Sequence, residues 1–150
     1  MVTDAFGALL EEIGSALKIP GIKPDANNCC LIKFKGGLMV QFEKDRTGDY
    51  LLIVVDYGAI PAGKYRELIF TEALKANFQP APRYGVFAYS KQAKEFIFFE
   101  RLPLKDLQGS RVAEILTPFL EKARTWKEAL ARGDVPTIVA KSSGMFGLQK

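Results

Sequence analysis

CCLIKFKGGLMVQFEKDRTGDYLLIVVDY, residues 29–57, carries the strongest structural pattern in this chain of 150 residues. Apolar and polar residues alternate along it in three runs, which predict three β-strands: Cys29–Lys35, Leu38–Glu43 and Tyr50–Tyr57. Gly36 and Gly37 predict a two-residue hairpin turn after the first run. The polar run Lys44–Asp49 predicts a longer turn after the second. Because both connections are short, we expect an antiparallel meander.

Helical periodicity lies on both sides of these strands. Before them, apolar residues from Phe6 to Leu17 recur at helical spacing and predict an amphipathic helix over Asp4–Leu17. After them, Pro61 is placed in the first turn of a second helix, over about 62–77. The expected buried stripe of this second helix consists of Tyr65, Leu68, Ile69, Ala73 and Ala76.

The remainder of the chain predicts a second hairpin and a long helix. Tyr84–Ser90 and Glu95–Leu102 have the pattern of paired strands, and about 104–132 has helical spacing. Pro118 within that helix predicts a kink or a division into two helices, and Gly133 predicts its end. The element order is therefore α-β-β-β-α-β-β-α, an α+β fold in which helices pack against an antiparallel sheet. We expect one domain, 1–133, followed by a loosely ordered tail, 134–150.

The predicted sheet has apolar residues on both faces. Alternation places Cys30, Ile32 and Phe34 on one face of the first strand, which we interpret as the core face. Four further apolar residues fall on the opposite face: Leu31, Met39, Leu52 and Val54. A helix of the same chain, a partner subunit or a bound peptide could cover that second face, and the pattern alone does not choose among them.

The composition excludes several classes of chemistry. There is no histidine, so histidine-dependent triads and metal sites are absent, and the adjacent Cys29 and Cys30 suit neither a structural disulfide nor a CxxC site. Asp45 and Asp49 do not have the spacing of a calcium loop and are better explained as turn residues. We therefore expect no enzymatic activity, no metal and no cofactor. No apolar run is long enough to span a membrane, and the N-terminus does not resemble a signal peptide.

Charge supplies an alternative hypothesis. The net charge is +4, and residues 76–150 hold 12 basic and 7 acidic residues, a net charge of +5. This half could favour nucleic acid or an acidic partner, with a basic group around Trp126: Lys122, Arg124, Lys127 and Arg132. We interpret it instead as a solvated surface, because Glu121 and Glu128 interrupt the group and Trp126 continues the apolar stripe. A small-molecule site between the first helix and the sheet is a third hypothesis, for which the sequence offers no polar anchor.

The order of elements resembles that of the class I (CesT-like) type III secretion chaperones of bacteria. The matching features span about residues 4–132. They comprise the first helix ending in Leu17-Lys18-Ile19-Pro20, the segment Asn27-Asn28-Cys29-Cys30-Leu31, the exit Asp56-Tyr57-Gly58-Ala59-Ile60-Pro61, and Phe119-Leu120 followed by Trp126-Lys127. Members of that family are typically acidic, whereas this chain has a pI of about 9.1.

The resemblance implies a cytoplasmic, non-catalytic protein that holds the N-terminal segment of a secreted effector extended and presents it to the secretion apparatus. It implies a homodimer or a heterodimer with a related chaperone. The implied client-binding residues are Phe6, Leu10, Leu31, Met39, Leu52 and Val54. The implied dimer interface consists of Tyr65, Leu68, Ile69, Tyr84 and Val86. A basic regulatory or nucleic-acid-binding protein on a related fold remains the alternative.

Overall fold

A computed structural model of the chain describes residues 5–137, and its element order matches the α-β-β-β-α-β-β-α prediction apart from one added 3-10 turn. The elements in chain order are α1 (Ala5–Leu17), β1 (Cys29–Phe34), the 3-10 turn η1 (Lys35–Gly37), β2 (Leu38–Lys44), β3 (Tyr50–Gly58), α2 (Lys64–Asn77), β4 (Val86–Ser90), β5 (Glu95–Pro103) and α3 (Gly109–Arg132).

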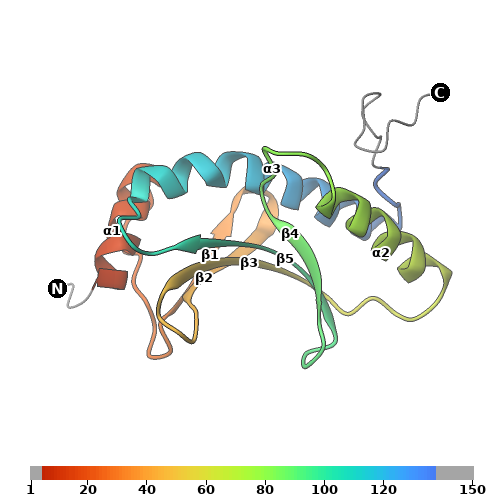
Figure 1. Cartoon of the computed structure of the whole chain (residues 1–150), viewed down its shortest axis with the longest axis horizontal. Helices are drawn as coiled ribbons and strands as arrows, with labels where there is room; N and C mark the ends of the chain where they lie inside the picture. The colour runs from red at the N-terminus through yellow and green to blue at the C-terminus, as the bar shows by residue number, and fades with distance from the viewer. Residues whose placement is uncertain (1–4, 138–150) are drawn as a thin grey trace.

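The five strands form one antiparallel sheet in the order β1-β2-β3-β5-β4, so β1 and β4 are its edges. All three helices lie on the same side of this sheet, with α3 running along it, α1 at one end and α2 at the other (Figure 1). Since no helix lies on the far side within residues 5–137, the fold has two layers and leaves one face of the sheet without a helix.

The core fills the space between the helices and the near face of the sheet. The strands contribute alternating residues such as Val40, Phe42 and Ile53, all fully buried. From α3, Phe119 stacks on Phe98 with ring centroids 4.7 Å apart, and Trp126 packs on Phe87 at 4.2 Å. The predicted core face is therefore confirmed for Cys30 and Ile32, which are buried, and Phe34 packs at its margin.

Four local predictions need correction. Phe34 pairs with Leu38, so the first hairpin has a three-residue loop, Lys35–Gly37, rather than a two-residue turn. Pro61 precedes α2, whose N-cap is Gly63. The last helix begins at Gly109 instead of about residue 104. It also continues through Pro118 as one helix, because a proline removes only one backbone bond while buried residues on both sides, such as Leu116 and Phe119, pack against the core.

At the C-terminal end of the described region, the predicted end of the last helix can be compared with the structure. Gly133 ends α3 in the left-handed conformation, φ 75°, as predicted. Val135, which belongs to the tail predicted over 134–150, packs against the core, and residues 138–150 of that tail lie outside the described residues. Over residues 5–137, none of the helices combines the length and the hydrophobicity that crossing a bilayer requires.

Candidate binding surfaces

The face of the sheet without helices carries an apolar patch, which we call the outer-face patch. Its members alternate with core residues on four adjacent strands: Leu31, Met39, Leu52, Val54, Ile97 and Phe99. Leu31 is 61% exposed and Met39 is 41% exposed, whereas the other four are half-buried by their neighbours. Extended apolar surfaces of this kind usually mark interaction sites. The sequence prediction that Leu31, Met39, Leu52 and Val54 share a second face is confirmed.

Polar and charged side chains accompany this patch on the same face. Gln41 lies opposite Val54, and Glu43 lies opposite Leu52. The Arg101 guanidinium stacks over the Tyr50 ring, 3.5 Å from the ring centroid. An apolar centre beside polar groups is typical of protein-binding surfaces.

The first helix does not extend this surface. Phe6 is 2% exposed and Leu10 is fully buried, because both belong to the stripe with which α1 packs into the core. The expectation that these two residues face outward is therefore wrong. Helical periodicity identifies the apolar face of α1, and that face turns inward here.

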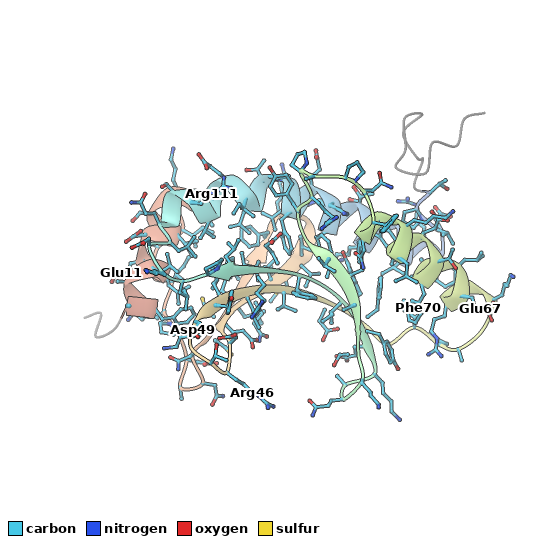
Figure 2. The ribbon with its side chains drawn as sticks, in the orientation of Figure 1. Glu11, Arg46, Asp49, Glu67, Phe70 and Arg111 are labelled. Carbon is cyan, nitrogen blue, oxygen red and sulfur yellow. The ribbon has the colours of Figure 1, made fainter. Side chains whose placement is uncertain are left out.

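A second exposed apolar surface lies where α2 meets the edge strand β4. A cavity of about 130 Å³ opens there between Leu74 of α2 and Tyr89 of β4. Phe70 points from α2 toward the sheet (Figure 2), and its ring lies 5.8 Å from that of Tyr89. The exposed apolar residues of this surface, which we call the α2–β4 surface, are Leu68, Leu74, Phe78 and Tyr89.

Only part of the predicted dimer interface lies on the α2–β4 surface. Leu68 is 43% exposed there, and Tyr65 is half-buried, with its hydroxyl donating a hydrogen bond to the Asp134 carbonyl. Ile69 is fully buried, so the expectation that it is available to a partner is wrong. Val86 is exposed, but it pairs with Phe99 and so lies on the outer face, and the half-buried Tyr84 precedes β4.

Sequence reasoning missed the most exposed members of this surface. Leu74 is 68% exposed and Phe78 is 55% exposed, although both are large apolar residues. The available signal was that Leu74 falls outside the predicted buried stripe of α2, so its side chain had no place in the core. Tyr89 ends the strand Tyr84–Tyr89 that the family resemblance implies in the dimer interface, but it was not named there as an individual residue.

The free edge of β4 is partly covered by α2. The Asn77 side chain donates a hydrogen bond to the Phe87 carbonyl at 2.9 Å and accepts one from the Phe87 amide at 2.8 Å. This side chain therefore occupies the ladder position that a further strand would use at Phe87. Any partner of the α2–β4 surface has to be bound mainly through side chains at this point.

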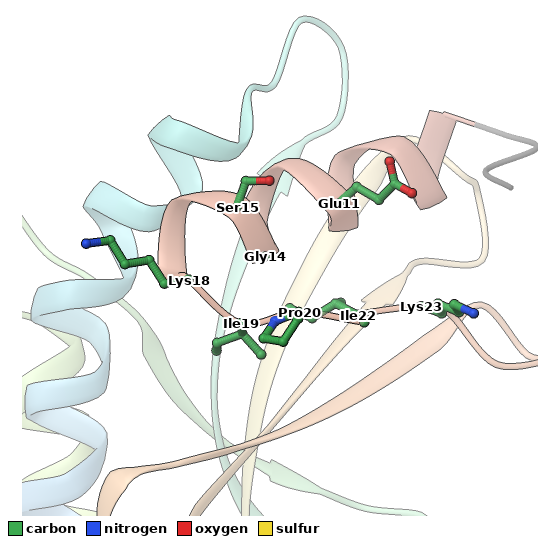
Figure 3. Close-up of a pocket in the computed structure, with 9 residues that line it drawn as sticks. Glu11, Gly14, Ser15, Lys18, Ile19, Pro20, Ile22 and Lys23 are labelled. Atoms are coloured by element: carbon green, nitrogen blue, oxygen red, sulfur yellow. The ribbon is translucent and has the colours of Figure 1, made fainter.

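A second hollow lies between the end of α1 and the loop that follows it (Figure 3). It measures about 450 Å³ and is lined by side chains that include Glu11, Ser15 and Lys23. The loop folds back because the Ile19 amide donates to the Gly14 carbonyl at 2.8 Å. Among residues 5–137 no polar or charged side chain is buried, so this hollow offers a small ligand no fixed polar anchor.

The candidate reactive groups have ordinary structural environments. Burial, followed by the charges of Glu43 and Asp25, raises the pKa of the Cys29 thiol, and burial raises the pKa of the Cys30 thiol. Both thiols therefore stay protonated near neutral pH, which makes them weak nucleophiles. Asp45 accepts hydrogen bonds within its turn, and the described residues contain no cluster of three or more potential metal ligands.

The basic group on α3 surrounds a core residue instead of a stacking platform. Trp126 is 2% exposed and packs on Phe87, so it cannot stack on a nucleic-acid base. Lys122 lies 5.5 Å from the ring centroids of Phe87 and Phe98, and burial lowers the pKa of its ammonium group. The ammonium group of this lysine is therefore engaged with two core rings in cation–π contacts.

Comparisons with known proteins agree with this geometry. The sequence model of the Tir chaperone protein (CesT) family matches residues 8–127. No curated protein matches the chain. The HopA1–SchA chaperone–effector complex is similar in structure, with a TM-score of 0.64, 16% identity and coverage of 85% of this chain and 100% of that one.

Two further solved structures are similar. The ExoT–SpcS complex from Pseudomonas aeruginosa has a TM-score of 0.62 at 17% identity, covering 83% of this chain and 98% of that one. The Yersinia pestis type III secretion chaperone SycH, in complex with a stable fragment of YscM2, has a TM-score of 0.58 at 18% identity, covering 80% and 98%. At these identities the likeness establishes the fold.

Proposed function

Because the chain belongs to the Tir chaperone protein (CesT) family, and is thus a type III secretion chaperone that binds effectors, we propose that it holds the N-terminal segment of a secreted effector extended, without catalysis. It does so in the bacterial cytoplasm and presents the segment to the secretion apparatus. The observation that carries this proposal is the outer-face patch, which is apolar, spans four strands and has no helix over it within residues 5–137.

The client binds in an extended form because the surface offers rows of side chains along strands rather than a deep pocket. Apolar residues of the client insert between Leu31, Met39 and the half-buried Leu52. Ordering a flexible segment costs several kcal/mol, so the contact has to extend along several strands. Polar neighbours such as Gln41 and Glu43 fix the position of the segment.

The α2–β4 surface joins two chaperone subunits, either two copies of this chain or this chain and a related chaperone. Leu74 and Tyr89 are exposed and line an apolar cavity that a partner side chain can enter, and Leu68 is exposed on α2. We retain Tyr65 and Tyr84 from the predicted interface at its margins, and Val86 on the outer face of the same edge strand.

The client surface is tested with the double variant Met39→Asp, Leu52→Asp. Two carboxylates placed in an apolar interface lose their hydration without gaining partners, so we expect affinity for a client to fall at least a hundredfold. The probe is an N-terminal fragment of an effector that the native chain captures, with binding measured by isothermal titration calorimetry.

The matched control is Gln92→Asp, Ala93→Asp, which adds the same charge to the exposed turn between β4 and β5. Circular dichroism and a thermal melt verify that both variants are folded. Unchanged client affinity of the first variant, with the fold intact, would show that the client uses another surface.

A further inference from the structure

The part of the outer face formed by β3 and β5, which we call the β3–β5 strip, carries opposite charges at its two ends. At one end lie Asp56 and Glu95. Both are on the face without helices, because Asp56 pairs with the outward Ile97 and Glu95 stands two residues before Ile97. At the other end lies Arg101, which pairs with Leu52. The strip is therefore an apolar surface with an acidic end and a basic end.

The two carboxyl groups at the acidic end lie close together. Asp56 and Glu95 are diagonal neighbours on adjacent strands, and Asp56 raises the pKa of the Glu95 carboxyl through a hydrogen bond and then through like-charge repulsion. One Asp56 oxygen also accepts a hydrogen bond from the Gly58 amide at 2.8 Å. Among residues 5–137 neither carboxyl has an ion-pair partner, the two lysines of the β4–β5 turn included. A cationic side chain placed between them would relieve their repulsion.

The guanidinium at the basic end is positioned by stacking. As described above, Arg101 lies over the Tyr50 ring, which is also on the outer face. Stacking occupies the flat side of the guanidinium and leaves its N–H donors, which lie in its plane, available. Arg101 is exposed and has no ion-pair partner in the described part of the chain. A guanidinium held in this way suits a carboxylate, which it can bind through two hydrogen bonds.

The length of the strip sets the spacing of matching residues in an extended client. Arg101 follows Glu95 by six residues along β5, which corresponds to about 20 Å at the rise of a β-strand. An extended client segment covers this distance in about six residues, and side chains at every second position point to the same side. Two such side chains fall between the ends, over the apolar residues of the strip: Leu52, Val54, Ile97 and Phe99.

We infer that one stretch of the client crosses the β3–β5 strip with a basic residue, two apolar residues and an acidic residue at successive alternate positions. The basic side chain lies between Asp56 and Glu95, and the acidic side chain lies on Arg101. This inference rests on the proposed function, because it names the chemistry of the client that the outer face holds.

The other half of the outer face has the reverse order of charges. Lys33 lies at the same end of the sheet as Asp56, and Glu43 lies in the same row as Arg101. A client stretch displaced onto β1 and β2 would therefore meet a like charge at each end. Repulsion of the displaced position adds to the attraction of the correct one, so the charges fix where the stretch binds.

Designed peptides of about seven residues test this charge pattern. The matched peptide has blocked ends, lysine at the first position, leucine and valine at the third and fifth, glutamate at the last, and threonine between them. A second peptide carries lysine at both ends. A third exchanges the glutamate with the preceding threonine, so its composition is unchanged but its carboxylate points to the other side.

NMR titration at low salt measures the Kd of each peptide from the amides of residues 52–56 and 97–101. We expect the native chain to bind the matched peptide about fivefold or more tightly than either of the others, because only the matched peptide places an opposite charge at both ends of the strip. The difference should shrink at high salt, since the contacts are near the surface.

Arg101→Glu provides the reciprocal test, because it makes the basic end of the strip acidic. We expect this variant to prefer the peptide with two lysines over the matched peptide by about the same factor. Arg111→Glu is the matched control. It makes the same change of charge at an exposed residue of α3, in the helical layer on the other side of the sheet (Figure 2), and should keep the native preference.

Equal affinities of the native chain for the three peptides would overturn the inference. The same reversal in Arg111→Glu would also overturn it, because the preference would then follow net charge. Failure of every peptide to bind would overturn it as well, since the strip would not hold a segment of the matching pattern. The captured effector fragment separates these results from failure of the proposed function. If the fragment binds the native chain but not Met39→Asp, Leu52→Asp, the proposed function stands without the charge pattern; if it binds both equally, the outer face is not the client surface.

Discussion

Gly85 is a residue whose missing side chain shapes the core. Its backbone has φ +89°, and a Cβ atom there would lie 2.2 Å from the tip of the Phe98 ring. Phe98 is fully buried and stacks on Phe119, so the ring has no room to retreat. Gly85→Ala combines backbone strain of about 1–2 kcal/mol with overpacking of about 1–3 kcal/mol. We expect a total loss of about 2–5 kcal/mol in the free energy of unfolding, measured by urea denaturation.

Gly58 provides the matched control. It has a similar backbone conformation, φ +84°, but nothing lies within 4 Å of the Cβ position. Gly58→Ala therefore isolates the backbone strain, about 1–2 kcal/mol. Equal losses in the two alanine variants would show that Phe98 yields to the added methyl group.

The turn between β2 and β3 depends on one carboxylate. Burial alone would raise the pKa of Asp45, but hydrogen bonds from the Thr47 hydroxyl and from three backbone amides of residues 48–50 outweigh it and hold the pKa below its ordinary value. A carboxyl whose pKa is lower in the folded state stabilises that state above its unfolded pKa of about 3.9, and the contribution is lost as the pH falls through the folded value.

Asp45→Asn removes this charge and weakens the turn. We expect the variant to be less stable than the native chain at pH 7, with a smaller loss of stability between about pH 5 and pH 2. Urea midpoints across this pH range provide the measurement. The control Asp49→Asn removes the same charge from the same exposed turn. If both variants keep the native acid dependence, hydrogen bonding to Asp45 does not contribute to stability.

The positions of the helices and strands were predictable from the local sequence pattern, but what each helix or strand packs against was not. Alternation placed the strands correctly, because burial on one face of a sheet leaves a period of two in the sequence. Pro118 was expected to divide the last helix, yet packing of Leu116 and Phe119 holds the helix together. Phe6 and Leu10 were assigned to a binding surface, although the same periodicity equally describes a helix face that packs inward.

The candidate site follows from the whole molecule rather than from any element. The excess of apolar residues on the second sheet face was visible in the sequence. In a strand that is buried on one side only, apolar residues alternate with polar ones, and here apolar residues also occupy positions where polar ones are expected. That all three helices pack on one side was not visible, since helix placement depends on long-range contacts such as those between α1 and α3. Of the α2–β4 surface, the sequence showed only that Leu74 falls outside the predicted buried stripe, because the approach of Leu74 to Tyr89 depends on how α2 packs beside β4.

Oligomeric state is the whole-molecule property on which the proposed chaperone depends. The α2–β4 surface exposes Leu74 and Phe78 to water, and burying them in a dimer stabilises the pair by about 25 cal/mol for each Å² of apolar area. We expect light scattering to give twice the 16.6 kDa of the chain, with the same mass at low and high salt because the contact is apolar. Leu74→Asp places a charge in that contact and should give the single-chain mass.

Ala93→Asp is the control for this variant, because it adds one charge to an exposed turn away from α2 and should keep the doubled mass. A Leu74→Asp protein that retains the doubled mass would place the interface elsewhere. If the native chain has the mass of one chain, the homodimer is ruled out. Co-expression with a related chaperone then tests whether the heterodimer forms instead. If the α2–β4 surface pairs with that second chaperone, Leu74→Asp should abolish the heterodimer and Ala93→Asp should leave it intact. Any other result would place the contact with the second chaperone elsewhere.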